Sequence, residues 1–270
     1  MNKIKVLVAL VAMVVISGCS VDKMVEKAIE KNPDLIFKAI EQNPQKFMET
    51  VQAAARKARP GGPNQDPSKS QDEEFKNPKV AEITENRILG NKDAQITLVE
   101  YTDLECPFCS RGNSVVNELK KIYGDKLRVV LKHLPLPMHQ KAMPAALYFE
   151  AIVASQGLEK AHAWSNEVFA NQEKMRSMKP EEFFKAMAKK AGVNDSKVSQ
   201  TLKKDQATLQ AVVQKDMQEA QKFGFQGTPG FLVNGVSVRG AYPVEAFKAI
   251  IDRHLAGGKT PDVGQMPKSK

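Results

Sequence analysis

The chain has 270 residues, 42% of them hydrophobic, which is enough for one sizeable core with appendages, and its formal net charge is +9. Its single tryptophan and four tyrosines offer no base-stacking surface, and its basic residues form no single run, so we expect no nucleic-acid binding. The only three cysteines, Cys19, Cys106 and Cys109, exclude a structural disulfide framework.

Residues 1–18 have the features of a signal peptide. Lys3 and Lys5 precede an apolar run over residues 6–16, which is too short to span a membrane comfortably. The run ends in Ser17-Gly18-Cys19, which resembles a bacterial lipoprotein box, where cleavage before the cysteine leaves Cys19 lipidated. An ordinary signal peptide followed by an incidental cysteine is the alternative.

The residue after Cys19 bears on the membrane that would hold the lipid. Ser20 follows, and not an acidic residue, which resembles Gram-negative lipoproteins sent to the outer membrane. We therefore expect a lipid-anchored protein of the bacterial cell envelope that faces the periplasm, with the outer membrane favoured over the inner membrane or the cell surface.

Residues 19–59 contain an internal repeat. Residues 24–30 align with residues 35–41, and Asn32-Pro33 aligns with Asn43-Pro44, both at a shift of 11 positions. This period keeps apolar side chains on one helical face, and each Asn-Pro supplies an N-cap followed by a proline. We predict short helices and homo-oligomerisation through residues 20–58; packing on the main domain is the alternative. The apolar stripe comprises Val25, Ile29, Ile36, Ile40, Phe47 and Val51.

Residues 60–78 predict a linker, because they are polar, rich in proline and glycine, and without apolar periodicity. From residue 79 to 256 the pattern becomes α/β. Strands are predicted near Ile88, over Ile96–Tyr101 and over Leu127–Lys132. A helix over Asn113–Tyr123 lies between the last two strands, which predicts a βαβ unit with parallel strands.

A block of helices follows over about residues 139–223. The sheet pattern returns over residues 230–233 and 236–239, and Asn234-Gly235 between them is a strong hairpin signal. Residues 243–255 predict a closing helix and residues 257–270 a polar tail. Within the block, helical spacing covers Ala142–Ser155, His162–Ala170, Glu181–Ala191 and Asp205–Phe223.

Cys106-Pro107-Phe108-Cys109 follows the strand at residues 96–101 and opens a helix. Two cysteines at this spacing are a redox pair or half of a metal site. Because the positive end of the helix faces the first sulfur, the pKa of Cys106 should fall well below the free value of about 8.5. Cys109 lies one turn further in, which suits an attacking Cys106 and a resolving Cys109. Pro107 fits the first helical turn, where its missing N–H costs nothing.

The metal alternative is a zinc half-site completed by His133 or His139. Zinc takes four protein ligands in a structural site and usually three in a catalytic one. The sequence has no second C-x-x-C and only scattered histidines. We therefore expect neither a metal nor a cofactor.

Three stretches together resemble the DsbA family of thiol–disulfide oxidoreductases, over about residues 80–256: Tyr101–Cys109, His133–Pro137 and Gly227–Gly235. The resemblance implies an α/β thioredoxin fold interrupted by an α-helical insertion, here preceded by a short all-helical amino-terminal arm. It also implies a redox disulfide between Cys106 and Cys109. A cis bond between Thr228 and Pro229 would face that pair, and a plain trans proline is the alternative.

Glu100 matches the position of the buried acidic residue of thioredoxin-like proteins, and strand alternation places it on the same face as Ile96 and Leu98. A carboxylate behind the cysteine pair is expected to carry protons to and from Cys109 and to pair with Lys132 on the neighbouring strand. A carboxylate that reaches solvent is the alternative. Phe108 departs from DsbA itself, which has histidine there, so we expect an intermediate redox potential, with Phe108 either contacting substrate or packing on the domain.

These features predict an enzyme that forms or isomerises disulfides in cysteine-containing secreted proteins and is recycled by a membrane redox partner. An oligomer would favour isomerase activity and a monomer oxidase activity. The alternative from another class is a surface lipoprotein that keeps a catalytically inert thioredoxin scaffold for partner binding.

Overall fold

The computed structural model describes residues 27, 30–32, 34–43, 46–47, 50 and 67–257. The predicted signal peptide, Cys19 and the tail beyond residue 257 lie outside these residues. The chain divides into two compact units, residues 1–66 and residues 67–270. In the first unit, α3 (Asp34–Gln42) contains the second predicted repeat as a helix, with 62% of Phe37 exposed. Self-association of this arm stays a prediction.

The second unit is built on a five-stranded sheet with the order β1-β3-β2-β4-β5. β2 and β3 run parallel, with α6 (Pro107–Tyr123) between them, which confirms the predicted βαβ unit. The other neighbours are antiparallel, and the turn between β4 and β5 is made by Asn234 and Gly235 at φ values of 46° and 89°. The strands are β1 (Ile88–Leu89), β2 (Ile96–Thr102), β3 (Leu127–His133), β4 (Gly230–Val233) and β5 (Val236–Arg239).

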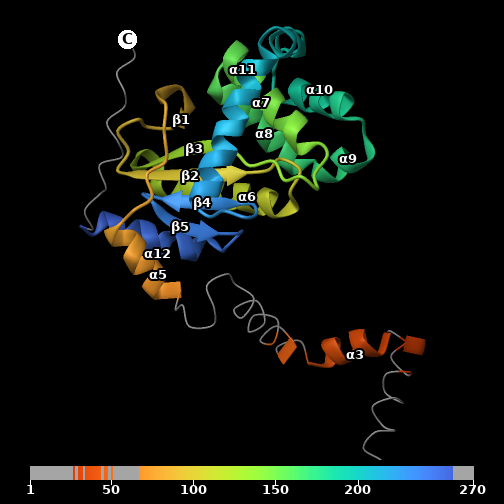
Figure 1. The fold of residues 1–270 in the computed structure, drawn as a ribbon, viewed down its shortest axis with the longest axis vertical. Helices are drawn as coiled ribbons and strands as arrows, with labels where there is room; N and C mark the ends of the chain where they lie inside the picture. The colour runs from red at the N-terminus through yellow and green to blue at the C-terminus, as the bar shows by residue number, and fades with distance from the viewer. Residues whose placement is uncertain are drawn as a thin grey trace, which may run out of the picture. The chain divides into compact units, whose positions relative to one another are not determined.

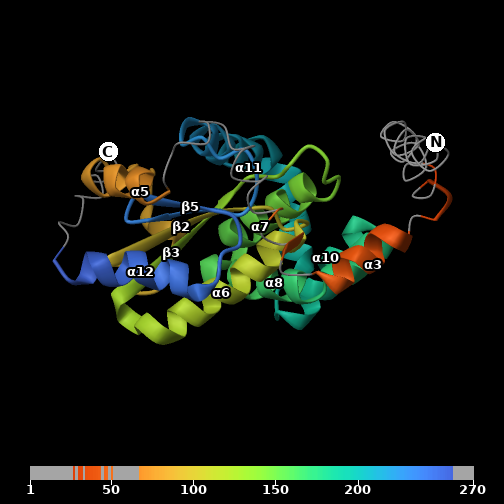
Figure 2. The same ribbon diagram turned by 90° about the horizontal axis from the view of Figure 1, so that it is seen from below.

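Helices cover both faces of the sheet, as Figures 1 and 2 show. Ile96 and Leu98 of β2 point to one face, where they pack with α6 and with α12 (Val244–Leu255). Val99 and Tyr101 point to the other face and pack with Ala220 near the end of α11 (Asp195–Lys222). The alternation along β2 therefore assigns even-numbered residues to the α6 side and odd-numbered residues to the α11 side.

The predicted helical insertion is confirmed, with different helix starts. α8 begins earlier than expected, and α11 begins at Asp195, because Asn194 caps it by accepting from the Lys197 N–H at 3.2 Å. The expected start at Asp205 is instead a kink within α11, at φ −116° and ψ 17°. The insertion helices before α11 are α7 (Ala142–Gln156), α8 (Leu158–Ala170), α9 (Gln172–Ser177) and α10 (Pro180–Lys190).

The linker prediction is wrong for part of its length, because α5 (Pro67–Lys76) is a helix packed against the sheet domain. Glu74 accepts hydrogen bonds from the Ser237 backbone N–H at 2.5 Å and its hydroxyl at 3.0 Å, at the edge strand β5. The Phe75 ring lies 4.8 Å from the His254 ring of α12. These partners come from residues far along the chain, so the polar sequence of α5 carries no local signal for its docking.

The predicted pairing of Lys132 with Glu100 is also wrong. Lys132 contacts Asp216 of α11 at 3.6 Å and forms a closer ion pair with Glu219. In the parallel register, Lys132 lies beside Tyr101 and Glu100 lies beside Leu131. Strand alternation therefore sends the two side chains to opposite faces of the sheet.

Candidate active site

Cys106 caps the amino-terminal end of α6, and Pro107 takes the first helical position, as predicted. The helix begins at Pro107 and not at Asn113. The Cys106 carbonyl accepts hydrogen bonds from the backbone N–H groups of Cys109, at 3.0 Å, and Ser110, at 3.3 Å. Both thiols are free; Cys106 is 4% exposed and Cys109 is fully buried. The corner thus leaves Cys106 as the more accessible sulfur.

The pKa values of the two thiols are shifted in opposite directions. A hydrogen bond from the Cys109 thiol, followed by contributions from Thr228 and from backbone N–H groups, lowers the pKa of Cys106 to about 5 against the opposing effect of burial. Burial first, and then the neighbouring Cys106, raise the pKa of Cys109 well above its ordinary value. The direction for Cys106 agrees with the sequence-based expectation, but the second thiol contributes more than the helix terminus. Near neutral pH the pair therefore combines one thiolate with one protonated thiol.

The peptide bond between Thr228 and Pro229 is cis, as predicted. The Cys106 sulfur lies 3.7 Å from the Thr228 carbonyl oxygen. Gly112 lets Pro229 and Phe231 pack closely against α6, because a Cβ atom at this position would lie 3.1 Å from both Pro229 Cγ and Phe231 Cζ. Sequence reasoning missed Gly112, since a single glycine inside a helix does not reveal what lies against it.

Glu100 is buried on the α6 side of β2, which excludes the solvent-exposed alternative. Burial raises its pKa to about 7, with a smaller opposing effect from Thr102. Its Oε1 atom has no hydrogen-bond partner among the described residues. Thr102 also lowers the pKa of Cys109, although its buried hydroxyl has no hydrogen-bond partner among the described residues. Glu100 therefore lies on the face of β2 that was predicted, and its role as a proton carrier for Cys109 stays a prediction.

Two polar residues that the sequence did not single out hold the cysteine loop. Asp103 is buried; its backbone N–H donates to Cys109 Sγ at 3.4 Å and its carbonyl accepts from the Cys106 N–H at 3.1 Å. Gln172 of α9 donates from Nε2 to the carbonyls of Leu104, at 2.9 Å, and Cys106, at 3.0 Å. The helical insertion thereby fixes the loop that carries the reactive sulfur.

Phe108, between the two cysteines, is 52% exposed. Its ring lies against the Arg111 guanidinium, 4.5 Å from the ring centroid, one turn along α6. An exposed aromatic ring beside the reactive sulfur offers a contact surface for a bound polypeptide.

Neither histidine of the zinc alternative is directed at the cysteine pair. His133 hydrogen-bonds Glu150 through Nε2 at 2.7 Å, and His139 hydrogen-bonds Asp103 through Nδ1 at 2.7 Å. The described residues contain no group of three or more histidine, cysteine, aspartate or glutamate side chains that could hold a metal ion.

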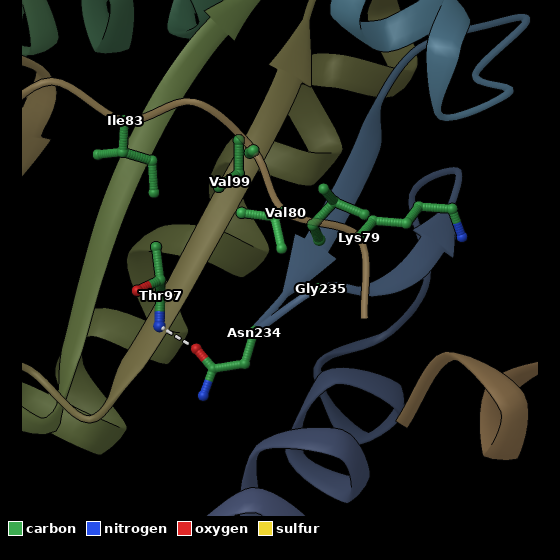
Figure 3. Close-up of a pocket in the computed structure, with 9 residues that line it drawn as sticks. Lys79, Val80, Ile83, Thr97, Val99, Asn234 and Gly235 are labelled. Atoms are coloured by element: carbon green, nitrogen blue, oxygen red, sulfur yellow. Dashed lines mark hydrogen bonds between the residues drawn. The ribbon is translucent and has the colours of Figure 1, made fainter. Parts of the chain in front are cut away.

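A small pocket lies at the other end of β2 (Figure 3). Asn234 Oδ1, in the β4–β5 turn, accepts from the Thr97 N–H at 2.7 Å beside the pocket. The residues that line it are Lys79, Val80, Ala81, Ile83, Thr97, Val99, Leu232, Asn234 and Gly235. Thr97 is the second residue of β2 and Cys106 follows the other end of the strand, so this pocket is separate from the cysteine site.

The sequence profile of the family described as thioredoxin (Thioredoxin_4) matches residues 82–253. The Na(+)/H(+) antiporter NhaA of Herminiimonas arsenicoxydans is 30% identical over 178 residues, which cover 66% of this chain and 27% of the antiporter. The chain spans about a quarter of the length of the curated relatives it matches. Among the described helices, none has the length and apolar character needed to cross a membrane.

Solved structures share the fold. A periplasmic thioredoxin-like protein from Salmonella enterica is 22% identical with a TM-score of 0.51, covering 63% of this chain and 90% of that one. The thiol-disulfide exchange protein alpha-DsbA2 from Wolbachia pipientis is 13% identical with a TM-score of 0.57, covering 69% and 96%. ScsC from Proteus mirabilis, in a transitional conformation, is 19% identical with a TM-score of 0.51, covering 86% and 98%. The likeness of fold therefore includes DsbA proteins.

Proposed function

Because this chain belongs to the thioredoxin family whose profile it matches over residues 82–253, we propose that it is a thiol–disulfide oxidoreductase of the bacterial envelope. It forms or isomerises disulfides in cysteine-containing secreted proteins through Cys106 and Cys109. One observation carries this proposal: an acidic Cys106 thiol and a Cys109 thiol that resists ionisation lie one helical turn apart, beside Thr228. Thiol exchange needs this division between a nucleophile and a resolving group.

Disulfide formation begins from the oxidised pair. A client thiolate attacks Cys106 Sγ, a bond forms between these two sulfurs, and the bond from Cys106 to Cys109 breaks. Cys109 leaves with the electron pair and takes a proton, for which Glu100 is the buried donor. A second client thiolate then attacks the client sulfur of the mixed disulfide and releases Cys106 as a stable thiolate. The client loses two electrons, and a membrane redox partner removes them from the reduced pair.

Isomerisation begins from the reduced pair. The Cys106 thiolate attacks a wrong client disulfide and releases one client sulfur as a thiolate. Another client thiolate attacks the mixed disulfide, which forms a new client disulfide and frees Cys106 with no net oxidation. If Cys109 attacks first, the client leaves reduced and the enzyme oxidised. The balance between these outcomes depends on the redox potential.

Trapping tests the exchange reaction. In Cys109→Ser the resolving sulfur is absent, so mixed disulfides between Cys106 and client proteins should accumulate under exchange conditions. Cys106→Ser/Cys109→Ser is the control and should trap none. An absence of adducts in Cys109→Ser would refute the proposed function. The inert-scaffold alternative predicts an ordinary thiol pKa for Cys106, which thiolate absorbance against pH measures directly.

The envelope location and the lipid anchor on Cys19 rest on the sequence of residues 1–20. Metabolic labelling with a palmitate analogue should mark the wild-type protein and not Cys19→Ala, and fractionation of the labelled membranes tests the preference for the outer membrane. If the wild-type protein and Cys19→Ala both stay unlabelled, the proposed lipid anchor is wrong.

The arm is proposed to make the protein an oligomer, which favours isomerase activity. The match to ScsC covers 86% of this chain, more than the family profile does, so the likeness extends beyond residues 82–253. Deletion of residues 20–60 should yield a monomer that loses isomerisation of scrambled ribonuclease and keeps dithiol oxidation. Unchanged isomerisation by a monomeric deletion variant would reject the role of the arm.

A further inference from the structure

A histidine from the start of the helical insertion lies at the cysteine loop. His139, between β3 and α7, places Nδ1 2.7 Å from Oδ2 of the Asp103 carboxylate. The side chain of Asp103 is fully buried, whereas that of His139 keeps 22% of its surface exposed. The pair is therefore a buried carboxylate covered by an imidazole ring that faces solvent.

Asp103 connects this histidine to both sulfurs. Its backbone contacts Cys106 and Cys109, as described above. Its carboxylate also accepts the Leu136 N–H at 2.9 Å and the Glu105 N–H at 2.8 Å. The carboxylate that accepts these two backbone N–H groups belongs to a residue three positions before the reactive Cys106.

We infer that His139 is a positioning residue whose positive charge neutralises Asp103, so that the Cys106 thiolate forms beside an ion pair and not beside a lone carboxylate. This inference rests on the proposed thiol exchange, because it explains how the thiolate is maintained. Phe108 supplies no cation between the cysteines, and His139 supplies one from the insertion. The charge reaches the site only through the fold, since His139 and Asp103 are 36 positions apart in the sequence.

The surroundings of His139 favour its charged form. Burial of the ring lowers its pKa, but the hydrogen bond and charge of Asp103, with the charges of Cys106 and Glu105, outweigh this and raise it above the ordinary value. The other charged group nearby is Lys141, whose N–H donates to Glu105 Oε2 at 2.6 Å. The Lys141 ammonium is held by the carbonyls of residues 175, 176 and 178. The imidazolium is therefore present from about pH 5, where Cys106 begins to ionise, up to the ordinary histidine value of 6.5 and somewhat beyond it.

The substitution that separates charge from shape is His139→Asn, since the asparagine amide still donates to Asp103 but carries no charge. In the reduced full-length protein, the midpoint of Cys106 ionisation is followed by thiolate absorbance and by the pH dependence of iodoacetamide alkylation. The variant should move this midpoint upward and slow alkylation near pH 5 by about threefold to tenfold, since one pKa unit is a factor of ten. Met138→Ala, an exposed neighbour, is the matched control and should leave the midpoint unchanged.

Two further variants test neutralisation. Asp103→Asn combined with His139→Asn removes both charges and should restore the wild-type midpoint, and His139→Lys, which keeps a positive charge, should retain it. If His139 had only a structural role, the double variant should shift the midpoint further than His139→Asn does, because the double variant loses more contacts. If His139→Asn leaves the midpoint unchanged, or if His139→Lys shifts it as far as His139→Asn does, the inference is wrong. These readouts need no client protein, so a failure of client trapping in Cys109→Ser would reject the proposed function and leave this test standing.

Discussion

Substitution of Glu100 by glutamine should stabilise the protein at alkaline pH. Glu100 is buried, and its pKa is raised from 4.5 to about 7 in the folded state. Between these values the folded protein binds more protons than the unfolded chain, so stability falls as pH rises. Below pH 4.5 the carboxyl group is protonated in both states and contributes nothing. Above pH 7 the full cost of a buried carboxylate is present.

The size of this effect follows from the shift in pKa. Each pKa unit corresponds to 1.36 kcal/mol, so ionisation of Glu100 costs about 3 kcal/mol of unfolding free energy at pH 8 and less than about 1 kcal/mol at pH 5. Glutamine cannot ionise. The advantage of Glu100→Gln over the wild type should therefore grow by about 2–3 kcal/mol between these two pH values. Any constant cost of burying the amide cancels in this comparison.

Urea unfolding of the reduced proteins at several pH values from 5 to 8 measures the difference. Glu150→Gln is the matched control, because Glu150 is also buried but its ion pairs with His133 and Arg87 outweigh burial and lower its pKa. The Glu150 carboxyl group is ionised in both states well above pH 4.5, so the cost of Glu150→Gln should stay nearly constant from pH 8 to pH 5 and shrink only below about pH 4.5. If the difference between wild type and Glu100→Gln is the same at pH 5 and pH 8, the assignment of a raised pKa to Glu100 is wrong.

Three other substitutions test the packing around the site. Gly112→Ala should slow thiol exchange severalfold, because the added Cβ atom would lie 3.1 Å from Pro229 Cγ. The gain in helix propensity, up to about 1 kcal/mol, should limit the loss of stability in urea. An unchanged exchange rate would refute the role of this contact. Gln172→Ala should lower the free energy of unfolding by about 1–2 kcal/mol, since two carbonyls of the cysteine loop lose their donor, and faster amide hydrogen exchange should appear at residues 104–106 and not in β5. Phe75→Ala should release α5 from α12 and speed proteolysis between residues 60 and 79 at constant Cys106 reactivity; equal cleavage rates in both proteins would show that α5 is not held by this ring.

The sequence alone determined the elements whose signals are local. The C-x-x-C corner, the parallel strands on either side of α6 and the Asn234-Gly235 hairpin depend on residues within a few positions of one another. Strand alternation likewise placed Glu100 on the face that the structure assigns to it. Periodicity and turn chemistry act over one or two turns of chain, which is why these features could be predicted without a structure.

The tertiary structure decided which distant groups meet. Lys132 pairs with α11 and not with Glu100, because the β2–β3 register sets which side chains share a face. A polar stretch read as linker became α5, because Ser237 and His254 provide its partners. Asp103 became a buried anion beside the reactive sulfur only when the loop before α7 supplied Leu136 and His139. Burial and charge pairing depend on all neighbours in space, and a sequence displays only the neighbours along the chain.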